Sequence, residues 1–168
     1  HEYSINDKNH RPLAISDRII QKIAGRVQHE VPFGGILVSK ELQKHAIELI
    51  PARPGSLSFL ENNLCQGLRE LYRATNHEYG FMGLGMHPLL KLDETTYWDH
   101  DEQEYYQTYD RLFNIRQHGW LNIQALQVNI PYTGKDELVA MFNKIRSLMP
   151  YLVAVSASSP MVEGKLTT

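Results

Sequence analysis

The sequence has 168 residues, of which 42% are hydrophobic and 21% are charged, and its net charge is −2. These values are typical of one soluble domain with a single core, and they give no electrostatic reason to expect binding to nucleic acid or to an anionic membrane. The single cysteine, Cys65, excludes an internal disulfide and a cysteine-based zinc site, which suits a cytoplasmic location.

Alternating polar and apolar residues predict strands in the first third of the chain. The first strand is expected over residues 2–7, with Glu2 on its polar side. A helix over 16–25 should follow, with Ser16 as its cap and Gly25 as its end. Residues 31–35 contain proline and glycine and are interpreted as a break, after which strand structure is expected over 36–50.

The rest of the chain predicts three helices and two strands. A helix over 58–77 should begin with a capping box at Ser58, and strands are expected over 81–86 and 122–130. Helices are expected over 102–118 and 136–157, the latter interrupted at Pro150. Two helices carry apolar stripes that should face the core: Leu60, Leu64, Leu68 and Leu71 in one, and Leu138, Met141, Phe142, Ile145 and Leu148 in the other.

The fold class follows from the polar faces of the expected strands. Parallel strands are usually apolar on both faces, whereas an antiparallel sheet commonly has one polar face. Although the element order is also compatible with a parallel α/β sheet, the pattern favours an α+β domain with an antiparallel sheet and flanking helices.

Glu48 is the most informative single residue. On a strand over 46–50 it shares its face with Ala46 and Ile50, so a buried carboxylate there needs a cation as its partner, either a basic side chain or a metal ion. Glu41 precedes it by seven residues, an odd separation. A turn or bulge must therefore intervene if both carboxylates serve one site.

Oxygen-bearing side chains recur on the polar faces of three expected strands: Glu2, Glu48, and Gln127 with Asn129. If these strands share one sheet face, they form a floor of hard oxygen ligands suited to Mg²⁺ and nucleotide phosphates. The alternative is an ordinary solvated face, with Glu48 paired to a surface lysine or arginine.

Two further motifs have both a functional and a structural interpretation. His87-Pro88 follows a glycine-rich strand and is either a site histidine or a turn. Residues 99–102 (Asp-His-Asp-Glu) are either a metal cluster or charges that match the dipole at a helix start, and the second interpretation is favoured. The sequence contains no phosphate-binding loop of the Gly-Lys-Ser/Thr type and no Gly-x-Ser-x-Gly motif.

Five motifs in order along the chain resemble glutamate–cysteine ligase family 2, the carboxylate–amine ligases. Residues 1–5 (His-Glu-Tyr-Ser-Ile) resemble its opening strand, and Glu41 with Glu48 matches its acidic pair seven residues apart. Residues 85–88 resemble its Gly-x-His-Pro element, and residues 126–129 resemble the Val-Gln-Val-Asn strand of its plant-like branch. Residues 152–160 resemble its Leu-x-Ala-Leu-Ser-Ala-x-Ser-Pro signature.

The resemblance implies a glutamine-synthetase-like antiparallel sheet that holds ATP and Mg²⁺ on its concave face. The implied reaction transfers the γ-phosphate to a glutamate side chain, and an amine, usually that of cysteine, attacks the acyl phosphate; the pathway would be glutathione biosynthesis. Four residues inherit metal-ligand roles: Glu2, Glu41, Glu48 and Gln127. His87 and Asn129 would position nucleotide or substrate.

The expected partners are therefore small molecules, namely glutamate with cysteine or another amine, and no nucleic acid or membrane; homo-oligomer formation stays open. Residues 1–168 are expected to be one domain, the N-terminal part of a larger ligase catalytic domain, because the chain starts without Met and the family continues past the Ser-Pro signature. On their own they should lack turnover. The alternative function is a non-catalytic ligand-binding or assembly module that retains the fold.

Overall fold

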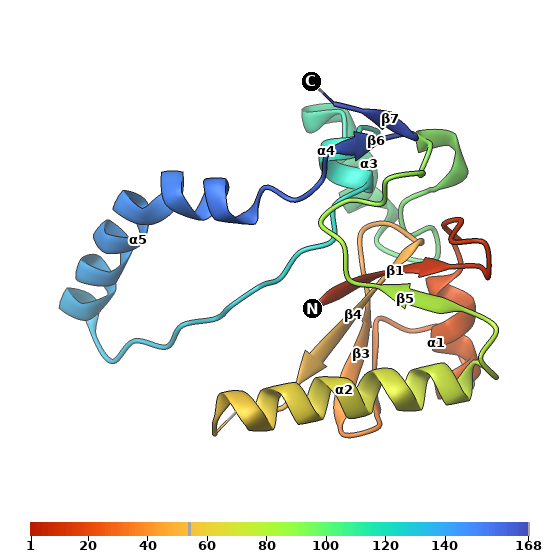
Figure 1. The fold of residues 1–168 in the computed structure, drawn as a ribbon, viewed down its shortest axis with the longest axis horizontal. Coiled ribbons are helices and arrows are strands. Elements are labelled where there is room, and N and C mark those ends of the chain that lie inside the picture. Colours follow the sequence, from red (N-terminus) through yellow and green to blue (C-terminus); the bar gives the residue numbers. More distant parts are fainter. Residues whose placement is uncertain (54, 168) are drawn as a thin grey trace.

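A five-stranded antiparallel sheet lies at the centre of the computed structural model, which describes residues 1–53 and 55–167 (Figure 1). The strand order is β2-β3-β4-β1-β5, and every neighbouring pair is antiparallel. The strands are β1 (Glu2–Asn6), β2 (Glu30–Phe33), β3 (Ile36–Lys40), β4 (Ala46–Pro51) and β5 (Gly80–Met82). Helices flank this sheet, so the predicted α+β class is confirmed.

One face of the sheet is apolar and carries the core. It is covered by α1 (Ser16–Ala24) and α2 (Leu57–Ala74), and α2 runs across the strands (Figure 1). The predicted leucine stripe is confirmed, since Leu64 and Leu71 are buried and the other two leucines pack against the same core. Gly67 lets α2 approach β3 closely, because a Cβ there would overlap the side chain of Ile36.

The expected strand over 36–50 is two strands of a hairpin, with a turn over 41–45 between β3 and β4. The expected break over 31–35 contains a strand that the sequence pattern missed, β2. Gly34 and Gly35 both have positive φ, at 59° and 83°, and form the two-residue turn between β2 and β3. Glycines at positions 34 and 35 therefore mark the end of β2, and the residues just before them can still form a strand.

Several element ends differ from the sequence predictions. Ser56, not Ser58, caps α2 by accepting a hydrogen bond from the Phe59 N–H at 3.1 Å. Ser16 makes no cap hydrogen bond, although Gly25 ends α1 in the left-handed conformation as predicted. The expected strand over 81–86 is limited to β5. The helix expected over 102–118 is divided into α3 (Gln103–Phe113) and α4 (His118–Leu121), because Asn114 adopts a positive φ.

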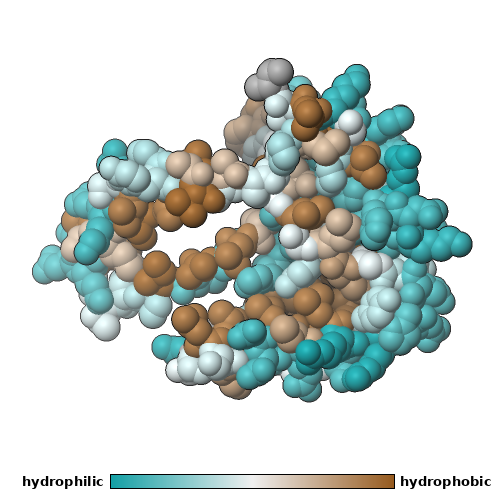
Figure 2. All heavy atoms as spheres, viewed as in Figure 1, coloured by the Kyte–Doolittle hydropathy of each residue, from teal (hydrophilic) through white to brown (hydrophobic). Residues whose placement is uncertain are grey.

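The C-terminal part of the chain departs most from expectation. Residues 122–130 form no strand in the structure and run as an extended segment to α5 (Lys135–Ser156), which lies apart from the sheet (Figure 1). No residue of α5 is buried, so the expected inward stripe is wrong here. Apolar side chains gather along both segments (Figure 2), with Val128 72% and Val155 86% exposed. The apolar stripe of α5 was expected to pack on a sheet that included a strand over 122–130. That segment joins no sheet among the described residues, so the stripe stays exposed.

The expected interruption at Pro150 is wrong, because α5 continues through Pro150 to Ser156. Lys144 and Arg146 separate two apolar stretches within this one helix. By length and composition alone this helix could cross a membrane, a test that core helices of soluble proteins also pass. The remaining elements are a short 3₁₀ helix, η1 (Leu92–Glu94), and a two-stranded hairpin of β6 (Met161–Val162) and β7 (Lys165–Leu166).

Candidate functional site

The face of the sheet opposite α1 and α2 carries a row of polar side chains. Glu2, Ser4 and Asn6 alternate along β1 with the core residues Tyr3 and Ile5. Glu2 lies directly opposite Glu48 in the register of β1 and β4. Residues paired in this way point to the same face with their Cβ atoms roughly 5 Å apart, so two carboxylates stand side by side.

Glu41 adds a third carboxylate from the turn that follows β3. Burial, together with the negative charges of Glu2 and Glu48, raises the pKa of Glu41 from 4.5 to about 7. The intervening turn explains how residues seven apart serve one cluster. We call Glu2, Glu41 and Glu48 the carboxylate cluster.

Glu48 has no basic side chain as an ion-pair partner among the described residues, and a metal ion as its partner stays a prediction. No member of the carboxylate cluster forms an ion pair with a lysine, arginine or histidine within residues 1–53 and 55–167. The interpretation of Glu48 as one half of a surface salt bridge is therefore wrong. Burial and the two neighbouring carboxylates raise the pKa of Glu41 more than Lys40 lowers it, so a cation placed among the three carboxylates would be favoured.

The extended segment after α4 contacts the start of β1 at Glu2. The Gln127 side chain donates from Nε2 to Glu2 Oε1 at 2.9 Å, and the Ala125 N–H donates to Glu2 Oε2 at 2.9 Å. The Glu2 N–H in turn donates to the Ala125 carbonyl at 3.0 Å. Burial raises the pKa of Glu2 and the neighbouring Glu48 raises it further, against the lowering effect of these two donors.

The structure thus brings together all four predicted metal ligands: Glu2, Glu41 and Glu48 as the cluster, and Gln127 against Glu2. Gln127 arrives on an irregular segment and not on the strand that sequence analysis expected. Their role as ligands stays a prediction. Asn129 lies two residues further along the same segment and is exposed.

His87 is buried, with 1% of its surface exposed, and both of its ring nitrogens are used within the protein. Nδ1 accepts a hydrogen bond from the Leu89 N–H at 3.1 Å, which leaves Nε2 to donate to Asn6 Oδ1 at 2.7 Å. Burial lowers the pKa of His87, so the ring is neutral. Neither ring nitrogen is free for a direct contact with a nucleotide or substrate. The ring instead holds the Leu89 N–H and the Asn6 side chain.

The polar face also contains buried residues that sequence reasoning missed. The His45 ring pairs through Nδ1 with the Thr95 hydroxyl at 2.9 Å, and Gln43 donates to the Ile123 carbonyl at 2.6 Å. Both lie in the turn between β3 and β4, where no periodic pattern could reveal burial. Asn6 had a usable signal, since it alternates with Glu2 on β1.

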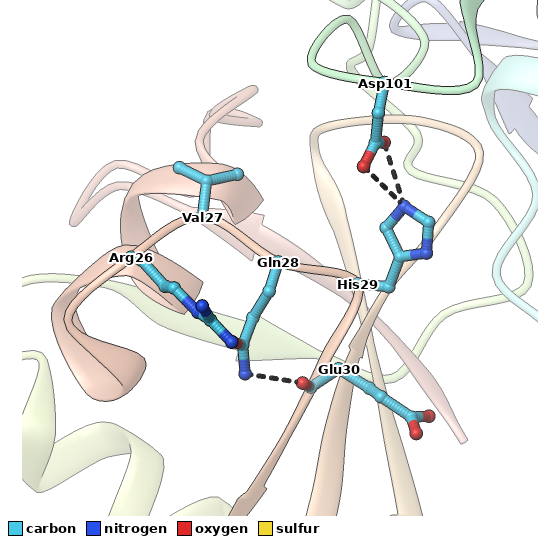
Figure 3. Close-up of a pocket in the computed structure, with 6 residues that line it drawn as sticks. All are labelled: Arg26, Val27, Gln28, His29, Glu30 and Asp101. Atoms are coloured by element: carbon cyan, nitrogen blue, oxygen red, sulfur yellow. Dashed lines mark hydrogen bonds and ion pairs between the residues drawn. The ribbon is translucent and has the colours of Figure 1, made fainter.

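The acidic run 99–102 forms two surface ion-pair clusters. Lys44 Nζ lies 2.8 Å from Asp17 and 3.0 Å from Asp99, and Lys40 Nζ lies 2.9 Å from Glu102. His29 pairs with Asp101 at 2.8 Å beside an open pocket of about 530 Å³ (Figure 3). Each cluster has three potential metal donors, and a lysine offsets one of its two carboxylate charges. The favoured interpretation, charges at a helix start, agrees with the position of the run, since Glu102 is the N-cap of α3; the residues also tie a loop to β3 and α1.

A second cavity, of about 700 Å³, brings together two motifs that are far apart in sequence. It is lined by Gly85 and Met86, by Ile123, and by residues 156–160. The Gly-x-His-Pro element and the Ser-Pro signature therefore face each other across one hollow, with the extended segment between them.

The comparisons with known proteins agree with these motifs. Residues 1–168 match glutamate-cysteine ligase family 2. An uncharacterized protein of Archaeoglobus fulgidus is 52% identical over 98% of this chain, and a glutamate–cysteine ligase of Natronomonas pharaonis is 28% identical over 97%. A putative glutamate–cysteine ligase 2 of Gloeobacter violaceus is 29% identical over 80%.

The chain spans less than half the length of these relatives, namely 45%, 43% and 36% respectively. The match to the family nevertheless extends over the whole chain, from the strand that carries Glu2 to the hairpin at its other end. This chain belongs to glutamate-cysteine ligase family 2.

Proposed function

We propose that the protein containing these residues is an ATP- and Mg²⁺-dependent carboxylate–amine ligase that forms a γ-glutamyl amide, with cysteine as the amine. The observation that carries the proposal is the carboxylate cluster, in which Glu2 and Glu48 share one sheet face, Glu41 in the adjoining turn is influenced by both charges, and none has an ion-pair partner among the described residues. A structural role would favour neutral or paired groups at these positions.

The donor set fits Mg²⁺, which prefers carboxylate and amide oxygens and keeps positions open for water and phosphate. Glu2, Glu41, Glu48 and Gln127 would hold the ion. When bound, Mg²⁺ neutralises the phosphate charge that develops during phosphoryl transfer.

The protein's own contribution is positioning and charge. Hydrogen bonds to both carboxylate oxygens fix Glu2, so its side chain is already oriented before a ligand binds. The pKa of Glu41 is raised to about 7, so its carboxyl would lose a proton to solvent when a cation binds. The site therefore becomes a stronger cation site as the pH rises.

The names of the relatives support a ligase and leave the amine to experiment. The Natronomonas pharaonis relative is named a glutamate–cysteine ligase, whereas the more similar Archaeoglobus fulgidus relative has no reaction in its name. Cysteine is the first candidate amine because of the family to which the chain belongs.

The test is phosphate release by the full-length protein mixed with ATP, Mg²⁺, glutamate and a panel of amines that includes cysteine. A ligase should release phosphate only when glutamate and an accepted amine are both present. Glu48→Gln should abolish release, while Glu61→Gln, an exposed carboxylate on α2, should not. If no amine stimulates release, the ligase proposal fails and the non-catalytic binding module is favoured.

A further inference from the structure

Asn122 holds the backbone of His87 with both ends of its side-chain amide. Its Oδ1 accepts from the His87 N–H at 2.9 Å, and its Nδ2 donates to the His87 carbonyl at 3.0 Å. The remaining Nδ2 hydrogen reaches His118 Nδ1 at 3.2 Å, and the side chain is fully buried. Asn122 is the C-cap residue of α4 and lies outside the sheet, so its side chain joins the end of α4 to the segment that carries His87.

The residues that follow Asn122 are also tied down, up to Ala125. Gln43 donates to the Ile123 carbonyl at 2.6 Å, and the Gln124 N–H donates to the Gly85 carbonyl at 3.0 Å. From Leu126 onwards the side chains are exposed. The position of Gln127 is therefore set by tethers upstream of it, because no strand pairing holds it.

His87 connects Asn122 to the sheet. Its Nε2–H donates to Asn6 Oδ1, and Asn6 lies on the same face of β1 as Glu2. A continuous path of hydrogen bonds thus runs from β1 through His87 and Asn122 into the extended segment. It returns to β1 where Ala125 and Gln127 donate to Glu2.

We propose that Asn122 is a positioning residue that fixes Ala125 and Gln127 against Glu2 and thereby sets the affinity of the carboxylate cluster for a divalent cation. This inference rests on the proposed function, because it takes the cluster as the cation site. Residues that orient metal ligands typically change affinity by about 10- to 100-fold when they are removed.

The test measures Mn²⁺ binding to the full-length protein by calorimetry for four variants. They are Asn122→Ala, Gln127→Ala, the double variant, and Thr75→Val as a control. Thr75 is buried and donates to the Leu71 carbonyl at the end of α2, so its variant loses a buried hydrogen bond away from the site. Gln43→Ala, which removes a single tether, is the milder perturbation if Asn122→Ala does not fold.

Asn122→Ala should weaken Mn²⁺ binding about tenfold, and its effect should disappear when Gln127 is already alanine. Hydrogen exchange of residues 123–127 should accelerate in Asn122→Ala and not in Thr75→Val. Independent effects of the two substitutions, or an equal effect of Thr75→Val, would overturn the positioning role. If the wild type binds Mn²⁺ but Asn122→Ala binds equally well, only this inference fails. Absence of Mn²⁺ binding by the wild type overturns the inference and removes the metal from the proposed function.

Discussion

Glu41 should make the metal-free protein less stable as the pH rises. The folded state raises the pKa of Glu41 from 4.5 to about 7, so it binds a proton more tightly than the unfolded chain does. Stability therefore falls between pH 4.5 and 7, and the penalty is fully present above pH 7. A shift of roughly 2.5 units corresponds to about 3 kcal/mol, an upper bound because the side chain keeps some exposure to solvent.

Glu41→Gln removes this penalty, because a neutral amide does not titrate. In EDTA at pH 8 the variant should be more stable than wild type by up to about 3 kcal/mol, and the difference should vanish near pH 4. Urea unfolding of the full-length protein across this range measures both values, with Glu61→Gln as the exposed control. Adding Mg²⁺ at pH 8 should stabilise wild type more than the variant. Equal stability of the two proteins at pH 8 in EDTA would refute the reasoning.

Three further predictions concern the fold. Gly67→Ala should destabilise the protein by about 1–3 kcal/mol although alanine favours helix, because the new Cβ lies 2.9 Å from Ile36 Cγ1. Adding Ile36→Ala should recover much of the loss in the urea midpoint of unfolding. The pKa of Asp17 is lowered, since hydrogen bonds from Lys44 and His100 outweigh the raising effect of burial. Asp17→Asn should therefore reduce the free energy of unfolding at pH 7, and the reduction should shrink as the pH falls below 3.8. Residues 1–168 prepared alone should bind ANS, and serine at Leu126, Val128 and Ile130 should reduce its fluorescence if the exposed apolar segment is the site.

The parts of the fold that were predictable are those in which a local pattern meets a nearby partner. Alternation along β1 and β4 correctly separated Ile47 and Leu49 from Glu48, because both strands lie in the middle of the sheet with one face on the core. The stripe of α2 was correct for the same reason. The apolar residues of α5 are less clearly confined to one side of the helix than those of α2, and they cover nothing, which shows that helical spacing alone does not reveal what packs on a helix.

The candidate site was only partly predictable, because its residues come from strands, a turn and an irregular segment. Glu2 and Glu48 could be paired from the alternation of two strands, and the odd spacing correctly required a turn before Glu41. The structure pairs both ring nitrogens of buried His87 within the protein, so any part it has in positioning nucleotide or substrate stays a prediction and would act through Asn6 and the Leu89 backbone. A motif indicated that this histidine matters, and only the structure shows which atoms it serves.

The contact between Glu2 and Gln127 explains why the remainder was out of reach of sequence reasoning. The two residues are 125 positions apart, and the segment that carries Gln127 is held by side-chain amides and by two isolated backbone hydrogen bonds, not by a ladder of strand hydrogen bonds. A ladder has a period that can be read from a sequence, whereas a tether formed by Asn122 on the backbone of His87 has none. The same lack of a ladder leaves the segment free to move whenever its tethers are released. A cation site that depends on Gln127 would thus be adjusted by residues that never touch the cation.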